Sequence, residues 1–174
     1  GFDLKHLIRT IVSSRAYQLT VESNEWNADD SINFSHQSPR RLNAEQLLDA
    51  IVVASGAVLR FDGVPAGFRA AELPDSKVNE GGFLDLFGRP PRESPCECER
   101  RSEVSLSQAL NLVNGPTIAD AVADPKGRIT GGIAAGKSDR EIIEEIYLAS
   151  LSRFPGPSDF QLAEDYLAGA GERP

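Results

Sequence analysis

The chain has 174 residues, of which 40% are hydrophobic and 25% are charged. That composition excludes a disordered chain, and the length suits one domain with a core of its own, or at most two small ones. Twenty-six acidic against eighteen basic side chains give a formal net charge of −8. Because no run of lysine or arginine offsets this charge locally, we expect no nucleic-acid partner. No window approaches eighteen apolar residues, so we also expect no membrane span.

The first predicted element is a helix within DLKHLIRTIVSSRAY, for which Asp3 is a suitable N-cap. His6 falls on its polar face, where a solvated histidine is more common than a ligand. Residues 18–41 read as a polar loop rich in turn formers. Within it, NADDSIN matches a calcium loop only in part, since Ile32 stands where the turn needs glycine. The apolar stripe of the helix consists of Leu4, Leu7, Ile8, Ile11 and Val12.

The second predicted helix is AEQLLDAIVVASG, with Asn43 as its cap and Gly56 as its end. It is apolar on almost every side, which predicts a buried helix. Asp49 is the exception, and its isolation makes it a candidate functional carboxylate. We favour the simpler expectation that Arg40, Arg41 or Arg60 forms an ion pair with it.

Residues 57–104 lose this regular pattern, since they hold five of the eleven prolines and five of the fifteen glycines. Long connections of this kind are usually functional or mobile. Their phenylalanines and leucines are too apolar for a free linker, so we expect an ordered arm, residues 60–104, pinned to the helices. Alternating phenylalanine and arginine suits a protein contact or a carbohydrate groove. The candidate interaction residues are Phe83, Phe87, Arg89, Arg92 and Arg100.

The remaining residues, 105–174, read as a set of helices. Gly115 ends one helix and Pro116 suits the first turn of the next. With no convincing strand, the fold class is all-α: an irregular multi-helix bundle in one domain, with N-terminal helices (1–59), the arm, and C-terminal helices. Three capping boxes mark helix starts, at Ser105 with Gln108, Ser138 with Glu141, and Ser158 with Gln161.

The stretch GGIAAGKS, Gly131–Ser138, fits the phosphate-loop pattern. Such a loop needs a buried strand before it, and the preceding DPKGRIT is too polar for one. We therefore expect no nucleotide site. Instead, Gly136 should end a short helix, Lys137 should lie at its negative end, and Ser138 should cap the next helix.

The only two cysteines, Cys96 and Cys98, lie in CECER. Two thiols supply half of a zinc site, and Arg100 favours a reactive thiolate while neighbouring glutamates oppose it. Metal binding, redox chemistry and a structural role all stay open, and the structural role is favoured. No other catalytic motif is present, so we expect no metal, cofactor or catalytic residue. The enzyme alternative is a carboxylate hydrolase in which Glu45 or Asp49 faces a cleft.

Several pieces together resemble a known family: PRRLNAEQLLDAI, LFGRPPRESPCECER, SLSQALNLVNGPTI and AAGKSDREIIEEIYLASLSRFP. The chain is similar to the planctomycete-type domain of unknown function found at the C-terminal end of large secreted proteins. Those proteins often carry a cytochrome-c-like module, which would hold any haem. The resemblance implies an extracytoplasmic setting, periplasmic or secreted, which makes a Cys96–Cys98 disulfide more credible. It implies no activity.

These observations favour a non-catalytic accessory or interaction domain. The chain starts GFDLK without methionine, so we expect a piece of a longer protein. Its partners would be other domains of that protein, with carbohydrate or another protein as further possibilities. The alternatives are part of a carboxylate hydrolase with a carbohydrate-type substrate, and a thiol redox element that uses Cys96 and Cys98.

Overall fold

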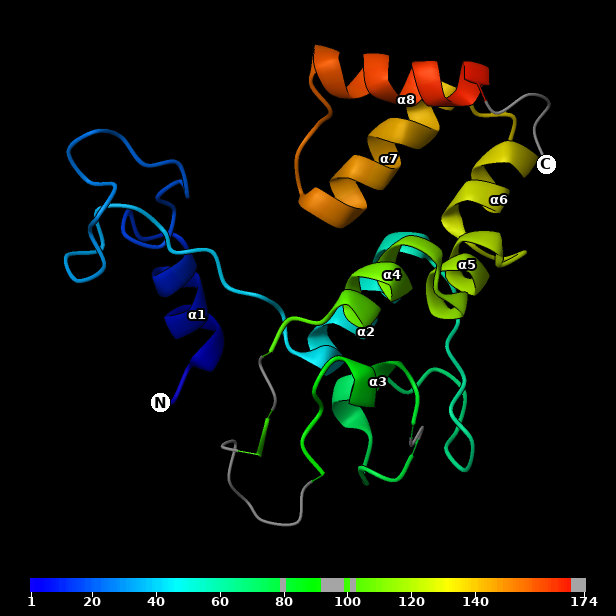
Figure 1. Ribbon diagram of the computed structural model, residues 1–174, viewed down its shortest axis with the longest axis horizontal. Helices are drawn as coiled ribbons and strands as arrows, with labels where there is room; N and C mark the ends of the chain where they lie inside the picture. Colours follow the sequence, from blue (N-terminus) through cyan, green and yellow to red (C-terminus); the bar gives the residue numbers. More distant parts are fainter. Residues whose placement is uncertain (79–80, 92–98, 101–102, 170–174) are drawn as a thin grey trace. The chain divides into compact units, whose positions relative to one another are not determined.

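The computed structural model describes residues 1–78, 81–91, 99–100 and 103–169. Within these ranges all regular structure is helical (Figure 1), so the predicted all-α class is confirmed. The chain divides into two compact units, residues 1–41 and 42–174. The helices are α1 (Leu4–Val12), α2 (Ala44–Ser55), the 3₁₀ helix η1 (Ala70–Glu72), α3 (Phe83–Leu86), α4 (Leu106–Asn114), α5 (Pro116–Ala123), α6 (Arg128–Ala134), α7 (Asp139–Leu151) and α8 (Pro157–Gly169).

Unit 1, residues 1–41, contains α1 and an irregular segment. Asp3 caps the helix as predicted, because its carboxylate accepts a hydrogen bond of 2.9 Å from the amide of His6. None of the 41 residues is buried within the unit. The five apolar side chains of α1 are between 38% and 67% exposed. This unit therefore has no hydrophobic core of its own.

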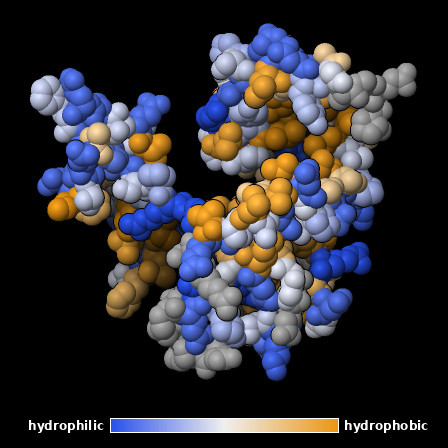
Figure 2. Space-filling model, in the orientation of Figure 1, coloured by the Kyte–Doolittle hydropathy of each residue, from blue (hydrophilic) through white to orange (hydrophobic). Residues whose placement is uncertain are grey.

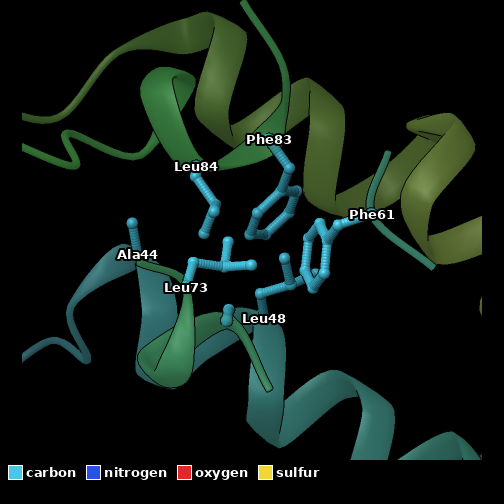
Figure 3. Packing of buried hydrophobic residues seen from close by; sticks show 7 residues of the cluster. Ala44, Leu48, Phe61, Leu73, Phe83 and Leu84 are labelled. Carbon is cyan, nitrogen blue, oxygen red and sulfur yellow. The ribbon is translucent and has the colours of Figure 1, made fainter. Parts of the chain in front are cut away.

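Unit 2 is built around α2, which packs against η1, α3, α5, α6 and α7. The predicted burial holds for one side of the helix only, because Leu48 is 2% exposed whereas Val53 is 63% exposed. The ends of the helix are as predicted, with a capping box at Asn43 and a left-handed Gly56 (φ +72°). Figure 3 shows the side chains of Phe61, Leu73 and Phe83 converging on α2. The core cluster consists of Ala44, Leu48, Phe61, Ala70, Leu73, Phe83 and Leu84.

The end of α2 is also held by a residue far along the chain. The guanidinium of Arg128 donates hydrogen bonds of 3.0 Å to the carbonyl of Ala54 and 3.1 Å to that of Val53. A helix C-terminus carries partial negative charge and unpaired carbonyls, so a cation there is favourable. This contact ties the first turn of α6 to the last turn of α2.

The last three helices form a connected set. Gly132 of α6 is buried against α7, and a β-carbon there would lie 3.0 Å from Cγ1 of Ile142. The guanidinium of Arg140 on α7 lies 3.8 Å from the ring centroid of Phe160, which is buried on α8. Such a cation–π contact stabilises the pairing of two helices without a further apolar residue.

Two of the three predicted capping boxes are confirmed, those at Ser105 and Ser138. The third prediction, Ser158 with Gln161, is wrong. The helix α8 begins at Pro157, so Ser158 lies inside its first turn. Proline is well suited to the first helical position, and the carboxylate of Asp159 accepts a hydrogen bond of 2.9 Å from the amide of Gly156.

Candidate functional site

The aromatic pair of the predicted arm belongs to the fold of unit 2. Phe83 opens α3 and is buried in the core, while Phe87 is half-buried beside it. Their rings are stacked, with centroids 4.3 Å apart and an interplanar angle of 24°. Most of this aromatic surface is therefore turned inward. A role for the pair in binding a partner stays a prediction.

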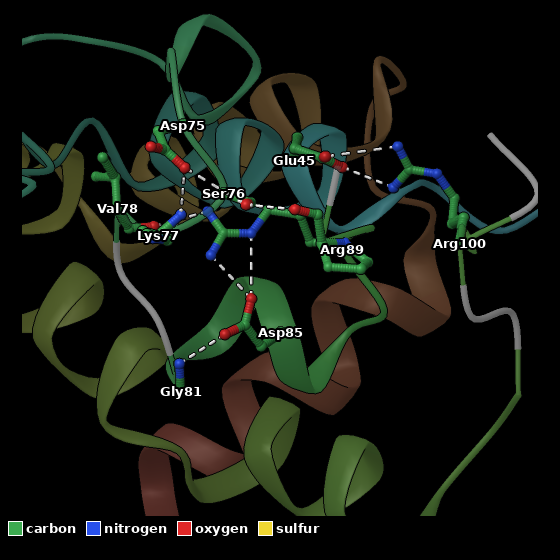
Figure 4. Close-up of polar contacts among 10 residues, drawn as sticks. Glu45, Asp75, Ser76, Lys77, Val78, Gly81, Asp85, Arg89 and Arg100 are labelled. Atoms are coloured by element: carbon green, nitrogen blue, oxygen red, sulfur yellow. Dashed lines mark hydrogen bonds and ion pairs between the residues drawn. The ribbon is translucent and has the colours of Figure 1, made fainter. Parts of the chain in front are cut away.

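Arg89 is the most buried charged side chain among the described residues, at 6% exposure. Its guanidinium donates hydrogen bonds of 3.1 and 2.8 Å to the carboxylate of Asp85 and one of 2.7 Å to the carbonyl of Val78. The same carboxylate accepts a hydrogen bond of 2.6 Å from the amide of Gly81 (Figure 4). Because a buried cation is costly unless it is paired and hydrogen-bonded, this geometry fits a structural clamp around α3.

A second buried ion pair joins Arg100 to α2. Glu45 is only 7% exposed, and its carboxylate accepts hydrogen bonds of 2.8 and 3.4 Å from the guanidinium of Arg100 (Figure 4). The paired residues are 55 positions apart in the sequence. Sequence reasoning singled out Glu45 as a possible catalytic carboxylate and Arg100 as an interaction residue, without foreseeing that they meet. A fork-shaped guanidinium on a carboxylate favours its ionised form, which suits a structural pair.

Asp49 also has a structural partner, although not the one expected. Its two carboxylate oxygens accept hydrogen bonds of 2.6 Å from the amide of Ala70 and 3.1 Å from that of Ala71. These amides begin η1, so Asp49 caps that short helix from a distance. The expectation that Arg40, Arg41 or Arg60 pairs with Asp49 is wrong for the residues that the structure describes. A carboxylate that accepts amide hydrogen bonds needs no cation to satisfy it.

Three predicted residues, Arg92, Cys96 and Cys98, lie outside the described residues. The disulfide, redox and metal interpretations of the two cysteines therefore stay predictions. Within the described ranges, no group of three or more histidine, cysteine, aspartate or glutamate side chains could hold a metal ion. In the same ranges, every helix is too short or too polar to cross a membrane.

The residues of the apparent phosphate loop take the local roles that we expected. Gly136 is left-handed (φ +71°) just after α6, and Ser138 caps α7 through a reciprocal pair with Glu141. Lys137 forms an ion pair with Glu145. Gly131 lies within α6, where a true phosphate loop would follow a strand. The helix-ending and capping predictions are confirmed, and the absence of a nucleotide site stays a prediction.

The partial calcium loop of unit 1 is organised by one carboxylate. Asp30 accepts hydrogen bonds from the amides of Ile32 (3.0 Å), Asn33 (2.7 Å) and Ser35 (3.0 Å), and from the hydroxyl of Ser35. These donors, the Ser35 hydroxyl first, hold the pKa of Asp30 well below its usual range. The loop is thus a turn closed by its own aspartate, as its composition predicts.

Sequence reasoning missed the orientation of α4. Gln108 and Asn111 are its half-buried residues, and the side-chain amide of Gln108 donates a hydrogen bond of 2.9 Å to the carbonyl of Leu86. The apolar side of the helix points away from the core, with Leu106, Leu110 and Val113 between 55% and 74% exposed. These three side chains, which we call the outer face of α4, lie one turn apart along the helix. Figure 2 shows hydrophobic side chains gathered over α4.

The two carboxylates that the sequence singled out thus have structural partners, Glu45 in an ion pair and Asp49 in a helix cap. A family model for a protein of unknown function, PSD1 (DUF1553), matches residues 1–167. The chain therefore belongs to the PSD1 family. Neither the curated proteins nor the solved structures contain a match to this chain.

Proposed function

We propose that this chain is a non-catalytic interaction domain of a larger extracytoplasmic protein, and that the outer face of α4 docks onto an apolar helix of another domain of that protein. The outer face is the observation that carries this proposal. Leu106, Leu110 and Val113 are three large apolar side chains left exposed on one side of a folded unit. Contiguous exposed apolar surface of this kind marks interaction sites in soluble proteins.

The chemistry of the face supports a helical, uncharged partner. The stretch from Val104 to Ala119 contains no ionisable side chain. A polyanion or a charged polysaccharide would find no group there to pair with, whereas an apolar stripe at helical spacing matches the side of another helix. Docking would remove the exposed methyl groups from water, which is the main favourable term in protein association.

Unit 1, taken by itself, holds a second face of this type. The apolar stripe of α1 is exposed, and Lys5 and Arg9 lie along one side of it. A segment of 41 residues that buries none of its side chains lacks the hydrophobic stabilisation that folding normally requires. This supports an interaction role for the domain, because both exposed stripes would be buried in a larger assembly.

The carboxylate hydrolase is less well supported than an interaction domain. Glu45 and Asp49 are the two carboxylates that the sequence favours, and each already accepts two hydrogen bonds within unit 2. A general acid or base needs a free position facing its substrate. The thiol redox alternative rests on Cys96 and Cys98, which lie outside the described residues.

Photo-crosslinking in the parent protein tests the docking proposal. A photoreactive phenylalanine analogue would replace Leu110, and in a matched control it would replace Ser107, which lies on the same helix outside the outer face. We expect intramolecular crosslinks from position 110 to one helix of a different domain, and few from position 107. Crosslinks to another segment of these 174 residues, or to a second copy of the protein, would overturn the proposal. So would equal crosslinking from both positions.

The extracytoplasmic setting has its own test. Intact-mass analysis with thiol alkylation, before and after reduction, would be made on protein exported by its own secretion route. Resistance of Cys96 and Cys98 to alkylation until reduction supports a disulfide and an oxidising compartment. Immediate alkylation of both thiols argues against the disulfide and favours the metal or redox alternatives.

A further inference from the structure

Unit 2 contains a cavity of about 550 Å³ that is separate from the outer face of α4. It lies between the segment after α2, the start of α3 and the corner where α4 meets α5. Its size is within the range of binding sites in proteins, roughly 300–1,000 Å³. Part of its lining is apolar, since Leu48, Phe61, Phe83 and Ala121 are buried and Leu86 is half-buried. Figure 3 shows Phe61 and Phe83 pointing toward each other above Leu48.

Residues 58–61 line one side of the cavity. Burial alternates along this segment, since Val58 and Arg60 are exposed, Leu59 is half-buried and Phe61 is buried. Alternation with a period of two is typical of an extended chain. The amide of Val58 donates to the carboxylate of Asp124 at 3.2 Å. The main-chain groups of Leu59 and Arg60, by contrast, form no hydrogen bond with the described residues.

The charged groups at the cavity are two carboxylates and one guanidinium. Asp124 accepts amide hydrogen bonds from Lys126 and Val58, which lower its pKa and keep it ionised. The side chains of Asp120 and Arg60 have no ion pair or hydrogen bond among the described residues. The lining therefore carries one more negative than positive charge, and a cationic group would be attracted to it.

We propose that this cavity binds an extended peptide segment of another protein, in which an apolar residue alternates with a basic one. The main chain of the peptide would pair with Arg60, as in the addition of a strand to an unpaired edge, because in an extended chain Arg60 shares an edge with Val58, whose amide donates a hydrogen bond to Asp124 in the cavity lining. An aliphatic side chain would enter the cavity over Phe61 and Phe83, and a lysine or arginine of the peptide would meet Asp120. A small ligand would leave the unpaired main-chain groups unused, which is why a peptide fits better. The proposal does not depend on the function assigned to α4.

Titration by two-dimensional NMR of the full chain tests this site, with defined peptides as probes. The first probe is the acetylated and amidated pentapeptide Thr-Leu-Arg-Leu-Thr. The others replace its arginine by glutamate, or methylate its central amide nitrogens. We expect saturable shifts at Leu59 and Arg60 with a dissociation constant of about 1 mM or lower for the arginine peptide. The glutamate and methylated peptides should bind at least about ten-fold more weakly.

Variants of the chain then locate the binding. Thr117 lines the cavity on α5, so Thr117→Phe should fill it and weaken binding about ten-fold or more, whereas Ala119→Phe, exposed on the same helix, should leave binding unchanged. Asp120→Lys should reverse the preference between the arginine and glutamate peptides, which a general loss of structure cannot do.

Several results would overturn the proposal. One is the absence of saturable shifts up to about 10 mM peptide. Another is equal binding of the arginine and glutamate peptides, or binding that Thr117→Phe and Asp120→Lys leave unchanged. Equal shifts with N-acetyl-arginine amide alone would assign a small-cation site in place of a peptide site.

Discussion

The helices α2 and α4 belong to the same unit and use their apolar residues in opposite ways. In α2, Leu48 is 2% exposed and the helix packs against η1, α3, α5, α6 and α7. In α4, Leu110 is 55% exposed, and it is Gln108 and Asn111 that turn toward the unit. Both helices begin with capping boxes, so the local rules that start a helix do not separate them.

The two helices differ in whether their own unit covers their apolar residues. Apolar residues at helical spacing predict that one side of the helix packs against another apolar surface. The spacing does not say whether that contact lies inside the same unit. In α2 the buried residues Ala44 and Leu48 belong to the core of the same unit, whereas Val53 is 63% exposed. In α4 the stripe is narrow, and the side-chain amide of Gln108 on the opposite side donates a hydrogen bond to the carbonyl of Leu86.

The largest predicted effect on stability comes from truncating Leu48, the buried leucine of α2. Leu48→Ala leaves a cavity at the centre of unit 2 in addition to the lost burial of the side chain. We expect the free energy of unfolding to fall by about 2–5 kcal/mol. Chemical denaturation followed by circular dichroism measures it. A loss below about 1 kcal/mol would show that α2 is not the centre of the fold.

The second-largest effect on stability is expected at Gly115, where α4 ends and α5 begins. A β-carbon at Gly115 would lie 2.2 Å from the carbonyl oxygen of Asn111 and 2.6 Å from its side-chain oxygen. The backbone at Gly115 is ordinary (φ −72°), so the close approach alone requires glycine. We expect Gly115→Ala to destabilise the protein by about 1–3 kcal/mol, since the helix must shift.

Gly131→Ala is the matched control for the Gly115 substitution. Gly131 lies inside α6, and an added β-carbon there meets nothing within 4 Å. Because alanine favours a helix over glycine, this variant should be more stable than the parent by up to about 1 kcal/mol. If both variants were equally stable, the packing of α4 on α5 would differ from that seen here.

The helix ends could be predicted from sequence because their causes are local. The caps at Asp3, Asn43, Ser105 and Ser138 each depend on residues within one turn. The start of α8 was mispredicted because two local signals compete there. Pro157 and Ser158 both suit a helix start, and the proline prevailed.

The sequence could identify residues of the candidate site, but not which of them lie in contact. Glu45 and Arg100 were both singled out, yet their pairing depends on a fold that brings together residues 55 positions apart. Asp49 reaches amides 21 and 22 positions away. The cavity beside Phe61 likewise depends on how α3 and α5 meet the segment after α2. No periodicity or motif carries such long-range geometry.

Removing the charge of Glu45 should destabilise the protein less than truncating Leu48 in the core. Glu45→Gln keeps the shape of the side chain and removes one charge, so the largely buried guanidinium of Arg100 loses its attraction to the Glu45 carboxylate. We expect a loss of about 1–2 kcal/mol in the free energy of unfolding. Glu164→Gln breaks the exposed Arg140–Glu164 pair of 3.9 Å and should cost roughly 0–1 kcal/mol. A double-mutant cycle that adds Arg100→Met would isolate the coupling, and a coupling near zero would contradict the pairing.

The Asp124 carboxylate accepts a hydrogen bond from the amide of Val58, in the segment after α2. This contact should make the stability of the protein depend on pH. Amide hydrogen bonds from Lys126 and Val58 lower the pKa of Asp124 in the folded state. Its contribution is therefore complete above the unfolded pKa of about 3.9 and is lost as the pH falls through the lower folded pKa. Asp124→Asn should reduce the difference in melting temperature between pH 7 and pH 3. Asp120→Asn removes a charge from the same region and serves as the control. An equal reduction of the melting-temperature difference in both variants would contradict a specific role of the Asp124 hydrogen bonds.

The smallest effect on folding should come from the outer face of α4. Leu110→Ala removes the same atoms as Leu48→Ala, but from a side chain that water already reaches. We expect the free energy of unfolding to change by less than about 0.5 kcal/mol. Leu110→Glu should be equally well folded, because its carboxylate would remain in solvent. A loss above about 2 kcal/mol in either variant would mean that the chain itself covers this face. The contrast between identical leucine truncations in α2 and α4 thus distinguishes a surface kept for a partner from one that the domain needs for its own stability.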